Sequence, residues 1–135
     1  MAKVKTFFII GNVFIFMLPL MYISCSDIMH IAGSYYCYQD NTPICAIHNF
    51  ENSNMNIPPT VLKYIVDGTH IIVMQKPAIP EDAMYRPVHY PNYSQDSLYY
   101  WIIEFNCDSI VGPLDYKSFL IECDDRNIDA SMLFK

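Results

Sequence analysis

Short runs of apolar residues alternate with polar turn residues through most of the chain, and the clearest pair of runs flanks Asp67-Gly68. These runs, about Thr60–Val66 and Thr69–Gln75, are rich in Val, Ile and Tyr, which favour strands. Both central residues of a type I′ turn need positive φ, which Asp tolerates and Gly adopts freely. The pattern therefore predicts an antiparallel hairpin whose turn is centred on Asp67-Gly68.

Other strands follow from the same two-residue period. Leu98–Phe105 is the clearest, with Tyr99, Trp101, Ile103 and Phe105 on one face and Tyr100, Ile102 and Glu104 on the other. Strands are also expected at Ile31–Gln39, entered through Gly33, at Tyr116–Cys123, and at Ala83–Tyr90, where Pro87 requires an edge or a bulge. Ile44–Phe50 is either a short strand or an apolar loop.

Polar stretches that contain Pro, Gly or Asn separate these strands and predict loops at Glu51–Pro59, Lys76–Asp82, Pro91–Asp96 and Asn106–Asp115. Ser131–Lys135 predicts only the stub of a strand. No helix is expected after the N-terminal segment. The succession of short strands predicts an all-β barrel or sandwich.

The N-terminal segment has the layout of a secretory signal peptide. Lys3 and Lys5 precede the apolar run Phe7–Ile23, and Ser24 and Ser26 are small residues suited to cleavage before Asp27. We therefore expect a signal peptide at 1–26, a domain at 27–135 and an extracellular location. A retained membrane anchor is the alternative, because the run has the length of a short span. A lipid-modified Cys25 is a weaker one, because Tyr22 replaces the usual branched aliphatic residue.

The charge of the chain excludes one class of partner. Removing Lys3 and Lys5 leaves six basic and fourteen acidic side chains, a formal charge of −8. A nucleic-acid surface needs clustered Lys and Arg, so no nucleic-acid partner is expected.

Four cysteines follow residue 26, namely Cys37, Cys45, Cys107 and Cys123. An even number in an exported chain predicts two disulfides, for which three pairings are possible. One disulfide with two free thiols is the alternative.

Several short motifs, in their shared order across Gly33–Cys123, resemble those of the lipocalin family, and of its apolipoprotein D-like members in particular. They are Gly33-Ser34-Tyr35-Tyr36, Phe50-Glu51-Asn52, Tyr64…Asp67-Gly68-Thr69, Ala83–Tyr90, Tyr100-Trp101-Ile102-Ile103 and Asp115-Tyr116…Cys123. The resemblance implies an antiparallel up-and-down barrel. The family's signature Trp is replaced by Tyr35, to which we assign a structural role at the closed end. Lys76–Asp82 is too short for the usual further strand, and the chain stops before the eighth strand and packing helix, so we expect a shortened barrel that is incomplete or open.

Lipocalin resemblance implies a small hydrophobic ligand, such as a fatty acid, a sterol or a retinoid-like molecule, inside the barrel. The candidate ligand-binding residues lie on aromatic strand faces: Tyr64, Ile72, Met74, Tyr85, Tyr99, Trp101, Ile103 and Phe119. The competing interpretation is that they only fill the core. A second functional hypothesis is an exported interaction protein that has a partial sheet and no cavity, and binds a protein through its Tyr-rich surface and free edges. A third is a membrane-anchored protein.

Other chemistry has little support in the sequence. The four histidines form no close pair and accompany no Cys-x-x-Cys, so no metal or other cofactor is expected. No nucleophile motif or phosphate-binding glycine loop is present, so we expect no enzyme activity. Asn92-Tyr93-Ser94 is a glycosylation sequon in an expected surface loop, which makes Asn92 a candidate glycosylation site.

Overall fold

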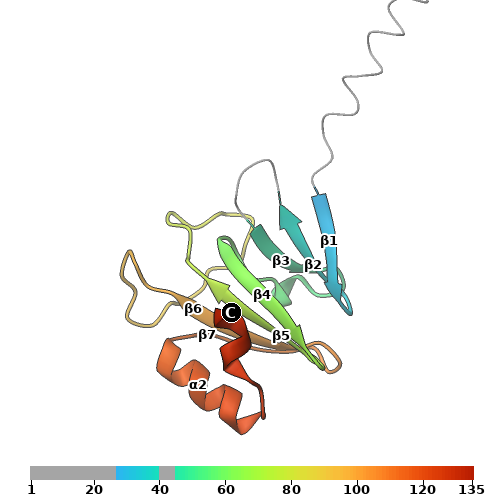
Figure 1. The fold of residues 1–135 in the computed structure, drawn as a ribbon. Helices are drawn as coiled ribbons and strands as arrows, with labels where there is room; N and C mark the ends of the chain where they lie inside the picture. The colour runs from blue at the N-terminus through green and yellow to red at the C-terminus, as the bar shows by residue number, and fades with distance from the viewer. Residues whose placement is uncertain (1–26, 40–44) are drawn as a thin grey trace, which may run out of the picture.

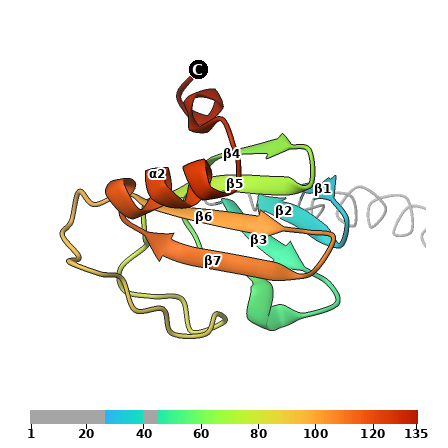
Figure 2. The same cartoon turned by 90° about the horizontal axis from the view of Figure 1, so that it is seen from below.

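The computed structural model describes residues 27–39 and 45–135, which form three layers (Figures 1 and 2). The first layer, the N-terminal sheet, has the order β1-β2-β3, and the second, the C-terminal sheet, has the order β4-β5-β6-β7. A C-terminal helix, α2, covers the far face of the second sheet. The strands are β1 (Asp27–Ala32), β2 (Tyr35–Gln39), β3 (Cys45–Asn49), β4 (Val61–Asp67), β5 (His70–Gln75), β6 (Tyr99–Glu104) and β7 (Ser109–Leu114). The helices are α2 (Tyr116–Asp125) and the 3-10 helices η2 (Ser53–Met55) and η3 (Ala130–Phe134).

All strand pairs in the described residues are antiparallel, and within each sheet every strand pairs with its neighbours in sequence. The mostly antiparallel β architecture is therefore confirmed. The strands form two open sheets, whereas a shortened barrel, incomplete or open, was expected. The signal segment 1–26 lies outside the described residues.

The N-terminal sheet begins with a hairpin, where the sequence pattern predicts one strand. Gly33 has φ +54° and reverses the chain between β1 and β2, so the expected strand Ile31–Gln39 is in fact divided. Cys45–Asn49 is a strand, which decides between the two interpretations of that stretch. A bridge between Ile47 and Ile57 continues this sheet beyond β3.

The central hairpin β4–β5 forms as predicted, but its turn lies one residue further along. Asp67 pairs with His70, so the central residues are Gly68 and Thr69. Of these two only Gly68 has positive φ, at +57°. A glycine at the first central position is the pattern of a type II′ turn, so the predicted type I′ turn is wrong.

Strand β6 is buried on both faces, which explains why six consecutive large residues can lie in one strand. Tyr99, Trp101 and Ile103 face the N-terminal sheet and join the inter-sheet core. Tyr100 and Ile102 face α2 and join a second core with Phe119 and Cys123. The predicted division of this strand into two faces is confirmed.

Strand β7 occupies a stretch that was expected to be a loop because it contains Gly112-Pro113. β7 is the edge of its sheet, and an edge strand can accommodate Pro113, which has no N–H to donate to the ladder. Gly112 lies against the indole of Trp101, so the edge strand closes tightly over the core.

The expected strand Tyr116–Cys123 is wrong, because these residues belong to α2. The Asp115 side chain accepts a hydrogen bond from the Ser118 N–H at 2.7 Å and caps the helix. Phe119 and Cys123, four residues apart, then point together into the second core. The C-terminal stub likewise forms η3, whose Leu133 is buried in the same core.

The expected strand Ala83–Tyr90 is also wrong, since these residues form no ladder and belong to a long connection between β5 and β6. Pro80 and Pro87 interrupt any run of donors there. In Figure 1 this connection passes beside the N-terminal sheet. In the described part of the chain, no helix is long and apolar enough to cross a membrane.

Candidate functional site

A cleft of about 500 Å³ lies on the outer face of the N-terminal sheet, the face turned away from the inter-sheet core. We name it the outer cleft. Its walls are mostly apolar and aromatic, and His48 and Asp82 add polar side chains to them. The lining residues are Ile28, Tyr36, Tyr38, Ala46, His48, Phe50, Pro59, Asp82, Met84 and Tyr85.

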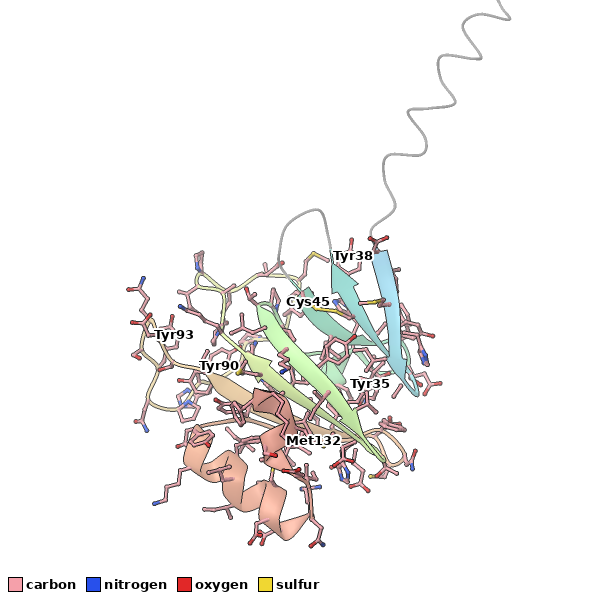
Figure 3. All side chains as sticks on the ribbon, viewed as in Figure 1. Tyr35, Tyr38, Cys45, Tyr90, Tyr93 and Met132 are labelled. Carbon is pink, nitrogen blue, oxygen red and sulfur yellow. A yellow bond between two sulfur atoms is a disulfide. The ribbon has the colours of Figure 1, made fainter. Side chains whose placement is uncertain are left out.

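The floor of the outer cleft follows from strand alternation. Tyr36 pairs with His48 and Tyr38 pairs with Ala46, so these four residues share one face of the sheet. The residues that alternate with them, such as Tyr35 and Ile47, point into the inter-sheet core and are fully buried. Figure 3 labels Tyr35 in the interior and Tyr38 on the strand β2. One strand pair therefore supplies both core and cleft.

The long connection supplies the other wall and is fixed at its start. The N–H of Lys76 and the N–H of Thr60 each donate to the other's carbonyl, at 2.9 and 3.1 Å, and Ala78 N–H donates to Pro59 O at 3.1 Å. Further along, the Asp82 carboxylate accepts the Met84 N–H at 2.9 Å and forms the turn that presents Met84 and Tyr85.

A buried glutamine fixes the far end of this connection. The Gln75 side chain donates to Pro58 O at 2.8 Å and to the Tyr90 hydroxyl at 3.1 Å, and it accepts from the Trp101 indole at 2.7 Å. Gln75 is fully buried, and burial raises the pKa of Tyr90 to about 12 although the Gln75 hydrogen bond lowers it. The amide therefore ties β5 and β6 to the segment before β4 and to the later part of the connection.

His48 and Tyr85 meet across the outer cleft. His48 Nε2 and the Tyr85 hydroxyl are 2.9 Å apart, and the two rings pack edge to face. Burial lowers the pKa of His48, and burial together with the charge of Asp82 raises the pKa of Tyr85. Both groups are thus neutral near pH 7 and can exchange hydrogen bonds with the polar end of a bound molecule.

The lowered pKa of His48 predicts an acid-sensitive fold. The unfolded chain binds this proton more tightly than the folded one, so stability is complete above about pH 6.5 and falls as the pH drops toward the folded-state pKa. Urea unfolding at about pH 7.5 and about pH 5.5 should show the loss, and His48→Gln should show less of it. The caps Asp115 and Asp129, whose pKa values are lowered by hydrogen bonds, contribute only in more acidic solution. Equal pH dependence in the two proteins would contradict the prediction.

The eight candidate ligand-binding residues do not line one cavity. Tyr99, Trp101 and Ile103 fill the inter-sheet core, with Tyr64 packed against it. Ile72 and Phe119 fill the second core, with Met74 beside it. Tyr85 alone lines the outer cleft.

A second hollow, of about 360 Å³, lies at the open edge between the two sheets. Met29 on β1 and Tyr64 on β4 are among its lining residues, together with Cys37 and Cys45. Cys37 and Cys45 form a disulfide that joins β2 to β3. This hollow is smaller and more open to solvent than the outer cleft, so we place the candidate site in the outer cleft.

The other two described cysteines are free, so the expected second disulfide is absent from the structure. Cys107 is exposed, whereas Cys123 is buried in the second core and burial raises the pKa of its thiol to about 11. The thiolate is the reactive form, so these two thiols should differ strongly in reactivity.

Thiol titration tests this arrangement. In the unreduced protein carrying Cys25→Ser, Ellman's reagent should react with one thiol, Cys107, in the native state and with two after denaturation. Cys107→Ser should abolish the native reaction. No reactive thiol after denaturation would mean that Cys107 and Cys123 are bridged after all.

Among residues 27–39 and 45–135, no group of three His, Cys, Asp or Glu side chains is placed to hold a metal ion. Asn92 is exposed in the loop before β6, where its glycosylation stays a prediction. Tyr35 lies in the inter-sheet core, with no closed barrel end around it.

Sequence reasoning missed most of the outer cleft. Tyr36, Tyr38 and His48 alternate with the core residues of their strands, and this was the signal available for a second usable face. No local pattern shows that Met84 and Tyr85 lie over that face, because their position depends on how the long connection packs.

The family model described as "Protein of unknown function (DUF3997)" matches residues 32–135. No curated protein and no solved structure matches the chain. The family match therefore covers β2 to β7 and α2, leaves out all of β1 except Ala32, and includes every lining residue of the outer cleft except Ile28.

Proposed function

We propose that this chain, which belongs to the DUF3997 family, binds a small and largely apolar molecule in the outer cleft, without catalysis. The observation that carries the proposal is the cleft itself, with a volume of about 500 Å³ and aromatic walls that converge on His48 and Tyr85. Small-molecule sites are typically hollows of this size, apolar with a few placed polar groups. From the lipocalin resemblance the proposal keeps the class of ligand, and it moves the site from a barrel interior to the outside of a sheet.

We further propose that residues 1–26 are a signal peptide and that the domain acts outside the cell. The disulfide between Cys37 and Cys45 supports an oxidising compartment, because such bonds are rare in reducing ones. The next residue after the proposed cleavage site is Asp27, the first residue of β1, so cleavage there would leave both sheets intact.

Exposed apolar side chains around the outer cleft also support the proposal. Phe50 is 63% exposed and Met84 is 85% exposed, and both line the cleft. Large apolar groups in this state lose unfavourable contact with water when a ligand covers them.

Titration with a neutral fluorescent probe, N-phenyl-1-naphthylamine, tests the proposal. We expect a saturable rise in probe fluorescence, and Phe50→Ala should weaken binding by about fivefold, because an exposed aromatic contact contributes about 1 kcal/mol. Phe134→Ala is the matched control, since Phe134 is 49% exposed but lies on η3 beyond the second sheet. No saturable signal, or equal loss in both variants, would contradict the proposal.

A second candidate function is protein binding through the C-terminal layer. Exposed apolar residues gather on α2 and η3, where the rings of Tyr116 and Phe134 contact each other while both stay half exposed. Exposed apolar patches of this kind mark interaction surfaces. Under this alternative Phe134→Ala would reduce partner binding, and Phe50→Ala would not.

A further inference from the structure

As far as the described residues go, the outer cleft has a negatively charged side chain in its lining and no positively charged one. Among its lining residues in the described part of the chain, Asp82 carries the one carboxylate, and none is Lys or Arg. Arg86 is the basic residue nearest to Asp82 in sequence, and it lines a separate small hollow together with Glu81 and Asp82. In that hollow two carboxylates accompany one positive charge.

The other basic side chains of the domain are placed elsewhere. Lys76 is paired with Asp96 at 3.6 Å, and Arg126 is paired with Glu104 at 3.6 Å and with Glu122 at 3.2 Å. Lys63 lies on β4, Lys117 on α2 and Lys135 at the C-terminus. The overall charge of −8 for residues 27–135 adds a field of the same sign as that of Asp82.

The aromatic walls of the outer cleft also favour a positively charged ligand. The rings of Tyr36 and Phe50 lie 4.4 Å apart at their centroids, and those of Tyr38 and His48 lie 5.9 Å apart, so aromatic rings line the floor of the cleft. The negative face of an aromatic ring attracts an organic cation within about 6 Å. His48, which faces Tyr85 and Tyr38, is uncharged near pH 7.5. It therefore does not repel a cation attracted by Asp82 or by the aromatic rings.

We infer that the outer cleft selects a hydrophobic organic cation, an alkylammonium-type molecule, over the carboxylate with the same apolar tail. The tail would lie on Ile28 and Phe50, and the ammonium group would lie between the tyrosine rings and Asp82. This inference rests on the proposed function and narrows its ligand class away from fatty acids.

Three probes with one tail separate the two proposals. Decyltrimethylammonium, decanol and decanoate are titrated into the purified protein by calorimetry near pH 7.5, the two ionic probes below their micelle concentrations and decanol below its solubility limit. We expect the cation to bind at least tenfold more tightly than the carboxylate, with the alcohol between them, and added salt to narrow the gap.

Asp82→Asn is the informative variant, because its side-chain oxygen can still accept the Met84 N–H and keep the turn. It should reduce the ratio of cation affinity to carboxylate affinity to about threefold or less, a ratio that an equal loss of binding for all three probes would not change. Asp124→Asn, the same charge change on an exposed residue of α2, should have no such effect.

Each outcome decides one proposal. Preference for the cation that is lost in Asp82→Asn supports the inference. Equal binding of all three probes, or tighter binding of decanoate, overturns it and leaves the proposed function standing. Binding of none of the three contradicts the proposed function itself, and the inference with it.

Discussion

Gly112→Ala should lower the free energy of unfolding by about 3 kcal/mol or prevent folding. Gly112 has φ +144°, a backbone conformation that residues with a Cβ rarely adopt. A Cβ built there would lie 2.6 Å from Trp101 Cε3 and 2.9 Å from the Tyr100 carbonyl oxygen. Overpacking of a rigid core commonly costs about 1–3 kcal/mol, and backbone strain adds to it.

The Trp101 ring has no room to yield, because it is fully buried and its indole N–H is held by Gln75. Gly68→Ala is the matched control. Gly68 also has positive φ, at +57°, but nothing lies within 4 Å of the position its Cβ would take. That variant should lose only about 1 kcal/mol. Urea unfolding followed by the fluorescence of Trp101, the one tryptophan of the chain, measures both, and equal losses would contradict the steric argument.

Gln75→Leu should lower the free energy of unfolding by about 3 kcal/mol, although it replaces a polar side chain by an apolar one of similar size. It leaves the Trp101 N–H, the Tyr90 hydroxyl and the Pro58 carbonyl without their partner. Each buried polar group left unpaired costs about 1–3 kcal/mol, partly offset by the added apolar burial.

Tyr90→Phe distinguishes the contribution of one hydrogen bond from that of all three hydrogen bonds made by Gln75. It removes one hydroxyl and leaves Gln75 bonded to Trp101 and Pro58, so we expect a loss of about 1 kcal/mol. A Gln75→Leu protein as stable as the wild type would show that these hydrogen bonds add nothing to the fold. The long connection, which supplies a wall of the outer cleft, would then need another anchor.

The β architecture was readable from the sequence where a strong local pattern and its burial agree. The hairpin β4–β5 and strand β6 were placed within a residue or so, because alternating Val, Ile and aromatic residues favour strands. The turn was misplaced because Asp67-Gly68 and Gly68-Thr69 both satisfy the need for a glycine, and only the pairing of Asp67 with His70 decides between them.

The helix α2 was missed because a period of two was imposed on a period near four. Phe119 and Cys123 fit both spacings, and the decisive signal was the Asp115 cap three residues before Ser118. Strand β7 was missed because a turn signal lies inside it. Gly112-Pro113 is a turn signal in general, but at an unpaired edge it fits a strand.

The candidate site was the least predictable part. Aromatic candidates such as Trp101, on β6, and Phe119, on α2, belong to two different cores, and the spacing of the residues along the chain could not show which layer each one faces. The outer cleft depends on a contact between His48 and Tyr85, which are 37 residues apart in sequence. His48 lies on β3, whereas Tyr85 lies in a connection without regular structure. Such a contact follows from tertiary packing and leaves no local pattern.

Mapping of bound decanol by amide and indole chemical shifts tests the central claim most directly, because it reports where the molecule lies. We predict shifts at Tyr36, His48 and Tyr85, with the Trp101 indole N–H unmoved in its bond to Gln75. Shifts confined to Trp101 and the inter-sheet core, or to α2, would contradict binding in the outer cleft.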